Sequence, residues 1–158
     1  MLDSSIPTTQ PAIGQLEDQP NLLLGLIGGG IAMLVGAAIW GAITYFTEYQ
    51  ISWMAVGVGF LVGTAIQFFG KGKSVTFGIS GAALSLIGCL LGNLVFYSGF
   101  IAREEGYPFL ELFLFLLTTP AAALEVFVMA FDFMDLLFYG LAAYVGFSAA
   151  MDIKRSRK

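Results

Sequence analysis

Long apolar runs alternate with short polar segments along the chain, and this pattern predicts helices that cross a membrane. The four clearest runs span residues 22–46, 51–69, 75–101 and 133–151. A helix rises about 1.5 Å per residue, so even the shortest of these runs can just cross a hydrocarbon core of about 30 Å. Only residues 47–50 separate the first two runs, which predicts a tight helical hairpin.

The stretch 109–131 is apolar enough for a fifth crossing, but two features argue against this interpretation. Pro120 follows Thr118 and Thr119 near its middle, a combination typical of a turn or a helix start. Polar side chains also recur at every seventh residue, so they share one face of a helix. These residues are Glu111, Thr118, Glu125 and Asp132. Such an acidic stripe is typical of helices that lie in the plane of the membrane interface.

Basic residues supply a third argument about the number of crossings. With four crossings, Lys71 and Lys73 fall on the same side as the basic tail 152–158. Arg103, in a polar loop expected at residues 102–108, falls on the other side. With five crossings, the two basic groups are separated. Cytoplasmic segments carry an excess of Lys and Arg, so four crossings are favoured, with the N- and C-termini both cytoplasmic. The stretch 109–131 then forms a pair of interfacial or re-entrant helices on the outer side.

Composition defines the class of protein. Of the 158 residues, 58% are hydrophobic and 11% are charged, and the mean hydropathy is +0.84. A soluble domain carries about 25% charged residues and could not bury this much apolar surface. The sequence therefore predicts an all-α, multi-pass protein in the lipid bilayer of a cell inner membrane. It has four transmembrane helices and an interfacial or re-entrant helical segment before the last helix.

The chain divides into three parts. Residues 1–20 contain no Lys, no Arg and no apolar run, so we expect a polar N-terminal tail and not a signal peptide. Residues 21–151 form the transmembrane domain. Residues 152–158 form a basic cytoplasmic tail.

Charge and residue types argue against several classes of function. The net charge of −4 argues against nucleic acid as a partner. The chain has no histidine and one cysteine, Cys89, inside an apolar run, so we expect no metal site and no cofactor. No serine-nucleophile elbow, phosphate loop or metal-ligand spacing occurs. We therefore expect no catalytic residues and no enzyme activity.

Small residues four positions apart predict close helix packing, since helices in lipid associate through close backbone contact. The candidate pairs are Gly25 with Gly29, Gly59 with Gly63, and Gly88 with Gly92. They serve either oligomerisation or packing within one bundle, and the second interpretation is favoured because every bundle needs such contacts. Asn93 is a further candidate for packing, because an amide in hydrocarbon needs an interhelical hydrogen bond. It ends a polar line with Ser85 and Cys89, which could face a pore, a ligand or a neighbouring helix.

Four acidic residues are candidates for contact with an ion or a partner, because ionisable groups at membrane depth are often functional. They are Glu111, Glu125, Asp132 and Asp135. The simpler interpretation is that they form the wet face of the interfacial helices. Asp132 and Asp135 also suit the start of the last helix, where carboxylates interact favourably with the helix dipole.

Three segments carry a resemblance to a group of small bacterial membrane proteins. They are the hairpin WGAIT (40–44) with YQISWMAVGVGFLVG (49–63), the segment GCLLGN (88–93) and the closing segment MDLLFYGLAAY (134–144). Together they resemble the helices of uncharacterised four-helix proteins, across residues 35–150. Some of those proteins carry an N-terminal zinc-ribbon or B-box-like module, which is absent here because residues 1–20 contain neither Cys nor His. The resemblance implies the four-helix architecture and no reaction.

Two hypotheses of function follow. The first is a structural or accessory membrane protein that forms a homo-oligomer or packs with other membrane proteins in a larger complex. It rests on the small-residue pairs and on the lack of catalytic groups. The second is a small proton or cation channel or transporter, based on the four acidic residues together with Ser85 and Asn93. The absence of a visible internal repeat lowers the second hypothesis.

Overall fold

The computed structural model confirms the all-α class. It describes residues 20–47, 53–130 and 132–151. Of these residues 91% are helical, and none of them forms a strand. The expected basic tail 152–158 and nearly all of the expected N-terminal tail lie outside the described residues, as does the hairpin loop between the first two helices.

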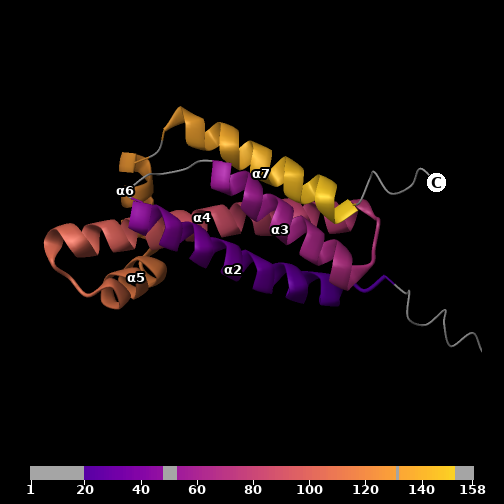
Figure 1. Cartoon of the computed structure of the whole chain (residues 1–158), viewed down its shortest axis with the longest axis horizontal. Helices are drawn as coiled ribbons and strands as arrows, with labels where there is room; N and C mark the ends of the chain where they lie inside the picture. Colours follow the sequence, from indigo (N-terminus) through magenta and orange to yellow (C-terminus); the bar gives the residue numbers. More distant parts are fainter. Residues whose placement is uncertain (1–19, 48–52, 131, 152–158) are drawn as a thin grey trace, which may run out of the picture.

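Four long helices lie side by side and form the body of the molecule (Figure 1). They are α2 (Leu22–Thr47), α3 (Trp53–Gly70), α4 (Val75–Glu105) and α7 (Phe133–Met151). Both α2 and α7 pack against α3 and against α4, while α3 and α4 also touch across the diagonal of the bundle. Each of the four is long and apolar enough to cross a membrane. Four such helices indicate a multi-pass membrane protein.

The contacts between residues define the directions of the helices. Neighbours α2 and α3 are antiparallel, and so are α4 and α7, whereas α2 runs parallel to α4 and α3 runs parallel to α7. The antiparallel contacts include Gly25 with Gly70, Gly36 with Val58, Gly78 with Met151, and Asn93 with Tyr139. The parallel contacts include Gly88 with Met33, Gly99 with Tyr45, Gly59 with Ala142, and Gly63 with Gly146.

Two short helices, α5 (Phe109–Thr118) and α6 (Pro120–Ala130), connect α4 to α7. The break between them falls at Thr119, and their axes bend by 104° there. Pro120 is the first residue of α6, a position where its missing N–H is no loss. Because α4 and α7 are antiparallel, the connection begins and ends at the same end of the bundle, as Figure 1 shows. We call α5 and α6 together the α5–α6 hairpin.

The end of α4 differs from the sequence expectation. The apolar run stops at residue 101, but the helix continues through Glu105. Residues 102–105 contain no helix breaker, and alanine, arginine and glutamate are good helix formers. The helix stops at Gly106, which adopts the left-handed conformation at φ 74° that glycine accepts without strain. Arg103, expected in a loop, therefore lies on the last turn of a helix.

The centre of the body is built from small residues that let the backbones of α3, α4 and α7 approach. A Cβ atom built on Gly59 would lie 2.4 Å from the carbonyl oxygen of Ala142, and one on Gly81 would lie 2.4 Å from that of Gly146. A Cβ on Gly146 would lie 2.1 Å from Oγ of Ser85. We call Gly59, Gly63, Gly81, Ser85, Ala142 and Gly146 the small-residue seam. Such contacts maximise van der Waals packing where lipid provides no hydrophobic drive between helices.

The opposite end of the bundle, away from the α5–α6 hairpin, is closed by polar contacts. The backbone N–H of Asn21 donates to the carbonyl of Gly70 at 2.9 Å, which ties the start of α2 to the end of α3. With the side-chain amide of Gln67 turned so that its nitrogen faces acceptors, Nε2 donates to the carbonyl oxygens of Gly72 at 2.7 Å and Ala150 at 2.6 Å. The loop that carries Lys71 and Lys73 therefore lies beside the C-terminal end of α7.

Candidate functional site

A side-chain hydrogen bond links α4 and α7 in the bundle interior. The Nδ2 group of Asn93 donates to the hydroxyl of Tyr139, so the amide links two helices. Its Oδ1 atom and the indole Nε1 of Trp40 are buried, and neither has a hydrogen-bond partner among the described residues. The ring of Trp40 covers Gly92, where a Cβ would lie 2.7 Å from the ring. This part of the interior is therefore a contact between helices in which two buried polar atoms lack a hydrogen bond to any described residue.

The rest of the polar line on α4 also faces neighbouring helices. The hydroxyl of Ser85 donates to the carbonyl of Gly81 at 2.6 Å and lies against Gly146 of α7. The thiol of Cys89 is fully buried, 4.0 Å from the carbonyl oxygen of Ala55 on α3. All three side chains of the line therefore pack against protein.

The two aspartates at the start of α7 act as helix caps. Oδ1 of Asp132 accepts from the N–H of Phe133 at 2.6 Å, and Oδ2 of Asp135 accepts from the N–H of Asp132 at 3.2 Å. Carboxylates at this position satisfy backbone donors that have no partner within the helix. Asp132 is exposed, whereas Asp135 is buried at 7% exposure. The sequence predicts these carboxylates at the start of the last helix, where they interact favourably with the helix dipole, and the structure adds the two hydrogen bonds.

The seven-residue stripe does not form one face in the structure. Glu111 and Thr118 lie on α5, Glu125 lies on α6, and Asp132 precedes α7, so the 104° bend separates the members. Both glutamates are exposed. Among the described residues, no three Asp, Glu or Cys side chains come close enough to share a metal ion. The structure brings together only Asp132 and Asp135 of the four acidic candidates.

All six candidate packing glycines are buried inside the described bundle. Those on α2 meet α3, those on α3 meet α7, and those on α4 meet α2 and α3. Their neighbours are Ile66 for Gly25 and Gly29, Ala142 for Gly59, Gly146 for Gly63, Val58 and Met33 for Gly88, and Trp40 for Gly92. Three other glycines, Gly30, Gly57 and Gly140, have no atom within 4 Å of an added Cβ and lie on the outer surface.

Two adjoining hollows near the α5–α6 hairpin are features that the sequence reasoning missed. The first, a polar cavity of about 280 Å³, is lined by Tyr45, Phe96, Phe100, Arg103 and Glu104. The second, an apolar groove of about 500 Å³ between α2, α4 and α5, is lined by Ala38, Gly41, Ala42, Tyr45, Phe46, Val95, Phe109, Leu110 and Phe113. Tyr45 lines both. The spacing of residues 96, 100, 103 and 104 on a single helix face is the signal that could have found the first.

A third hollow lies on the other side of α4. It has a volume of about 500 Å³, and α4, α5, α6 and α7 all contribute side chains to its lining. Among the described residues that line it, Tyr139 alone carries a polar group, its hydroxyl. The others are Leu90, Leu94, Leu116, Leu117, Pro120, Ala123, Leu124, Phe127 and Val128. The α5–α6 hairpin therefore leaves open space on both sides.

Comparisons with known proteins add no family. A scan against protein-family models, a search of curated proteins and a search of solved structures found no match to this chain. The resemblance to small bacterial four-helix membrane proteins stays a hypothesis based on the three quoted segments.

Proposed function

We propose that the protein is a structural or accessory integral membrane protein that self-associates or packs into a larger membrane complex. The observation that carries the proposal is the α5–α6 hairpin. Helix α6 makes few contacts with the four-helix body. One of them is the edge-to-face contact between Phe127 and Tyr97, with ring centroids 6.0 Å apart. Three apolar side chains of α6 stay largely exposed: Leu124, Val128 and Met129, at 63%, 68% and 87%. The first two line the third hollow.

The physical argument concerns the break at Thr119. A broken helix at membrane depth is tolerated where it is buried in protein or lines a cavity, because its free backbone groups need partners. The α5–α6 hairpin contacts the body mainly through α5, and no described side chain of α6 is fully buried. A second protein, or a second copy of this chain, that packs on the outer side of α6 would cover the break and the exposed apolar side chains together.

The proposal includes a topology of four crossings, with both termini on the cytoplasmic side of an inner membrane. The loop with Lys71 and Lys73 lies at the same end as the last residues of α7, which precede the basic tail. The positive-inside rule favours the cytoplasm for this end. The α5–α6 hairpin then sits on the outer side as a re-entrant or interfacial segment.

No observation favours the channel hypothesis. Ser85, Cys89 and Asn93 pack against α3 and α7, so they do not line an open path. The acidic residues are exposed or serve as caps at one end of the bundle. Ion flux is therefore not part of the proposed function. It is measured as a test if the protein proves to be a homo-oligomer.

Native mass spectrometry of the protein extracted gently from its own membrane tests the proposal. We expect a stoichiometric complex, either a homo-oligomer or a complex with a second membrane protein. A monomer that carries only lipid contradicts the proposal. If a homo-oligomer is found, reconstituted vesicles should show no ion flux above empty vesicles, and flux that falls in Glu125→Gln would return the channel hypothesis.

Site-specific cross-linking locates the contact. The native Cys89 is buried and is shielded from a thiol-directed photo-cross-linker. The reagent therefore labels a cysteine that is introduced on the surface. We expect Met129→Cys on α6 to cross-link to the partner seen by mass spectrometry. The matched control is Leu34→Cys, on the exposed face of α2 at 58% exposure. Equal cross-linking from both positions would contradict a specific contact at the hairpin.

A further inference from the structure

Charged and aromatic side chains share the polar cavity at the end of α4. Arg103 and Glu104 lie on the last turn of the helix, and the aromatic residues Tyr45, Phe96 and Phe100 also belong to the described lining. Phe96 and Phe100 contact each other with ring centroids 6.1 Å apart. A guanidinium group, a carboxylate and three aromatic rings thus surround a space of about 280 Å³. The cavity offers a site for a positive group and a site for a negative group side by side.

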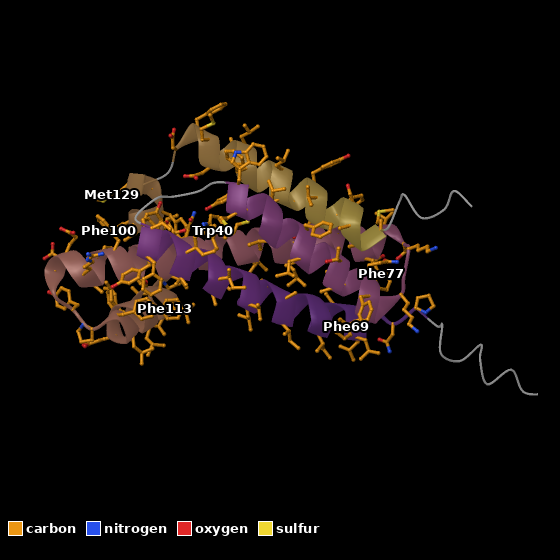
Figure 2. All side chains as sticks on the ribbon, in the orientation of Figure 1. Trp40, Phe69, Phe77, Phe100, Phe113 and Met129 are labelled. Carbon is orange, nitrogen blue, oxygen red and sulfur yellow. The ribbon has the colours of Figure 1, made fainter. Side chains whose placement is uncertain are left out.

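The apolar groove continues from this cavity toward the middle of the bundle. Small residues of α2, namely Ala38, Gly41 and Ala42, form its floor, and Phe113 of α5 forms part of the opposite wall. Its volume of about 500 Å³ lies within the roughly 300–1,000 Å³ typical of ligand sites. Tyr45 lies at the junction of the two hollows, with its ring against Gly99. Figure 2 shows Phe100 and Phe113 together at this end of the bundle, far from Phe69 and Phe77.

The order of the two hollows along α4 matches the layers of a membrane. Val95, in the groove, belongs to the apolar run that ends at residue 101, whereas Arg103 lies two residues beyond that run. At about 1.5 Å per residue, the two side chains are separated by about 12 Å along the axis. The groove is thus at the depth of acyl chains, and the polar cavity is at the depth of headgroups.

We propose that these two hollows form a binding site for a zwitterionic phospholipid of the surrounding membrane. The guanidinium group of Arg103 binds the phosphate, for which its forked N–H donors are matched. The carboxylate of Glu104 pairs with the positive ammonium group, as an ion pair with choline and with a hydrogen bond from N–H in the case of ethanolamine, and the rings of Tyr45, Phe96 and Phe100 offer faces to the same cation. One acyl chain lies in the apolar groove between α2, α4 and α5.

The presence of Glu104 distinguishes this headgroup from an anionic one. Phosphatidylglycerol carries a phosphate but no ammonium group, so it would leave the carboxylate without a partner beside a like charge. Phosphatidylethanolamine and phosphatidylcholine both satisfy the two charges. The site therefore selects by the second charge of the headgroup, and the apolar groove fixes the orientation of the lipid.

Lipid titration followed by native mass spectrometry of the full chain tests the site. The probes are phosphatidylethanolamine, phosphatidylcholine and phosphatidylglycerol with identical acyl chains. We expect one zwitterionic lipid to stay bound at concentrations where phosphatidylglycerol does not. Arg103→Gln should weaken its binding about tenfold, the effect expected when a charge-assisted hydrogen bond is lost. Glu104→Gln should remove the preference over phosphatidylglycerol.

Two further variants separate this site from general adhesion of lipid. Ala42→Phe fills the apolar groove and should reduce binding of the zwitterionic lipid as Arg103→Gln does. Lys73→Gln, at the opposite end of the bundle, should leave that binding unchanged. Phosphatidylglycerol retained as well as the zwitterionic lipids overturns the proposal, and so does unchanged binding in Arg103→Gln. Because Arg103, Glu104 and Ala42 are all exposed, the fold is expected to tolerate these changes, and circular dichroism of each variant verifies it.

Discussion

The body of the bundle and the α5–α6 hairpin are packed by different means. In the body, α3, α4 and α7 meet at the small-residue seam, where backbone lies against backbone. The hairpin is held by large side chains: Leu116 is the one buried residue of α5, and no described side chain of α6 is fully buried. The hollows lie beside the hairpin, on both sides of α4.

This difference shows what close packing requires in lipid. Helices there gain little from burying apolar surface, since lipid tails are equally apolar, so they adhere where backbones approach and many atoms touch. The seam meets this condition because its glycines present no side chain to their neighbours. Leucine and phenylalanine of the hairpin hold its helices at a distance. Spaces remain that a lipid or a partner can fill.

The largest expected effect comes from placing a large side chain in the small-residue seam. Gly59→Leu places a side chain 2.4 Å from the carbonyl oxygen of Ala142, where backbone cannot move aside. Gly146→Leu meets Oγ of Ser85 at 2.1 Å. Overpacking costs about 1–3 kcal/mol and occasionally more, and we expect at least the upper value for both variants. Thermal unfolding in detergent, followed by circular dichroism, measures the loss.

Matched controls lie on the same two helices. Gly57→Leu on α3 and Gly140→Leu on α7 enter open space, because no atom lies within 4 Å of an added Cβ at either glycine. Both should leave the unfolding temperature nearly unchanged. If Gly57→Leu and Gly59→Leu were equally destabilising, the seam would not be what holds the body together.

The spans could be predicted from the sequence because length and hydropathy decide them. The expected apolar runs match the four long helices to within a few residues wherever the structure describes their ends. The main difference is at the end of α4, where polar residues 102–105 continue the helix. A hydropathy pattern indicates where the hydrocarbon of the membrane ends. The helix itself ends where a residue adopts a non-helical conformation, here Gly106.

The relations between segments could not be predicted in the same way. The seven-residue spacing of Glu111, Thr118 and Glu125 indicates one face only while the helix axis is continuous, and the bend at Thr119 interrupts it. Glycine pairs indicate that another helix approaches closely, but not which helix it is, since all close helix contacts in membranes use the same small residues. The sequence therefore favours packing within the bundle over oligomerisation without naming the partner helices, and the structure places the six glycines against helices of the same chain.

The polar cavity was missed for a related reason. The sequence predicts a polar loop for Arg103 and Glu104. A loop predicts no helix face that these residues would share with aromatic side chains. Once α4 extends to Glu105, Phe96 and Phe100 fall on the same helix face as the two charges. The contribution of Tyr45 from α2 depends on the parallel packing of α2 and α4, which no local pattern indicates.

A smaller effect is expected from the polar link inside the body. Tyr139→Phe removes the hydroxyl that accepts from Asn93 and leaves the amide without that partner. Interhelical hydrogen bonds in membranes contribute about 0.6 kcal/mol on average, with about 1.7 kcal/mol as the upper value, so we expect a loss of about 1 kcal/mol. Tyr144→Phe, on the exposed face of α7, is the matched control.

A double-mutant cycle isolates this link from other contacts of the two side chains. Asn93→Leu combined with Tyr139→Phe should cost less than the sum of the two single changes, because the second change has no hydrogen bond left to break. Strictly additive losses in unfolding free energy would show that the pair does not stabilise the body as a hydrogen bond. The seam would then hold α4 against α7 alone.

The smallest effect is expected at Glu125, and its comparison with the cap residue Asp132 decides between capping and an outward contact. Asp132→Ala removes the carboxylate that accepts from the N–H of Phe133 and should destabilise α7 by about 0.5–2 kcal/mol. Glu125→Ala changes an exposed side chain on α6, so the free energy of unfolding of the isolated chain should change by no more than about 0.5 kcal/mol. Unfolding in detergent measures both. The reverse order would mean that Glu125 makes a stabilising contact within the chain, and that the α5–α6 hairpin is tied to the body more firmly than its large side chains imply.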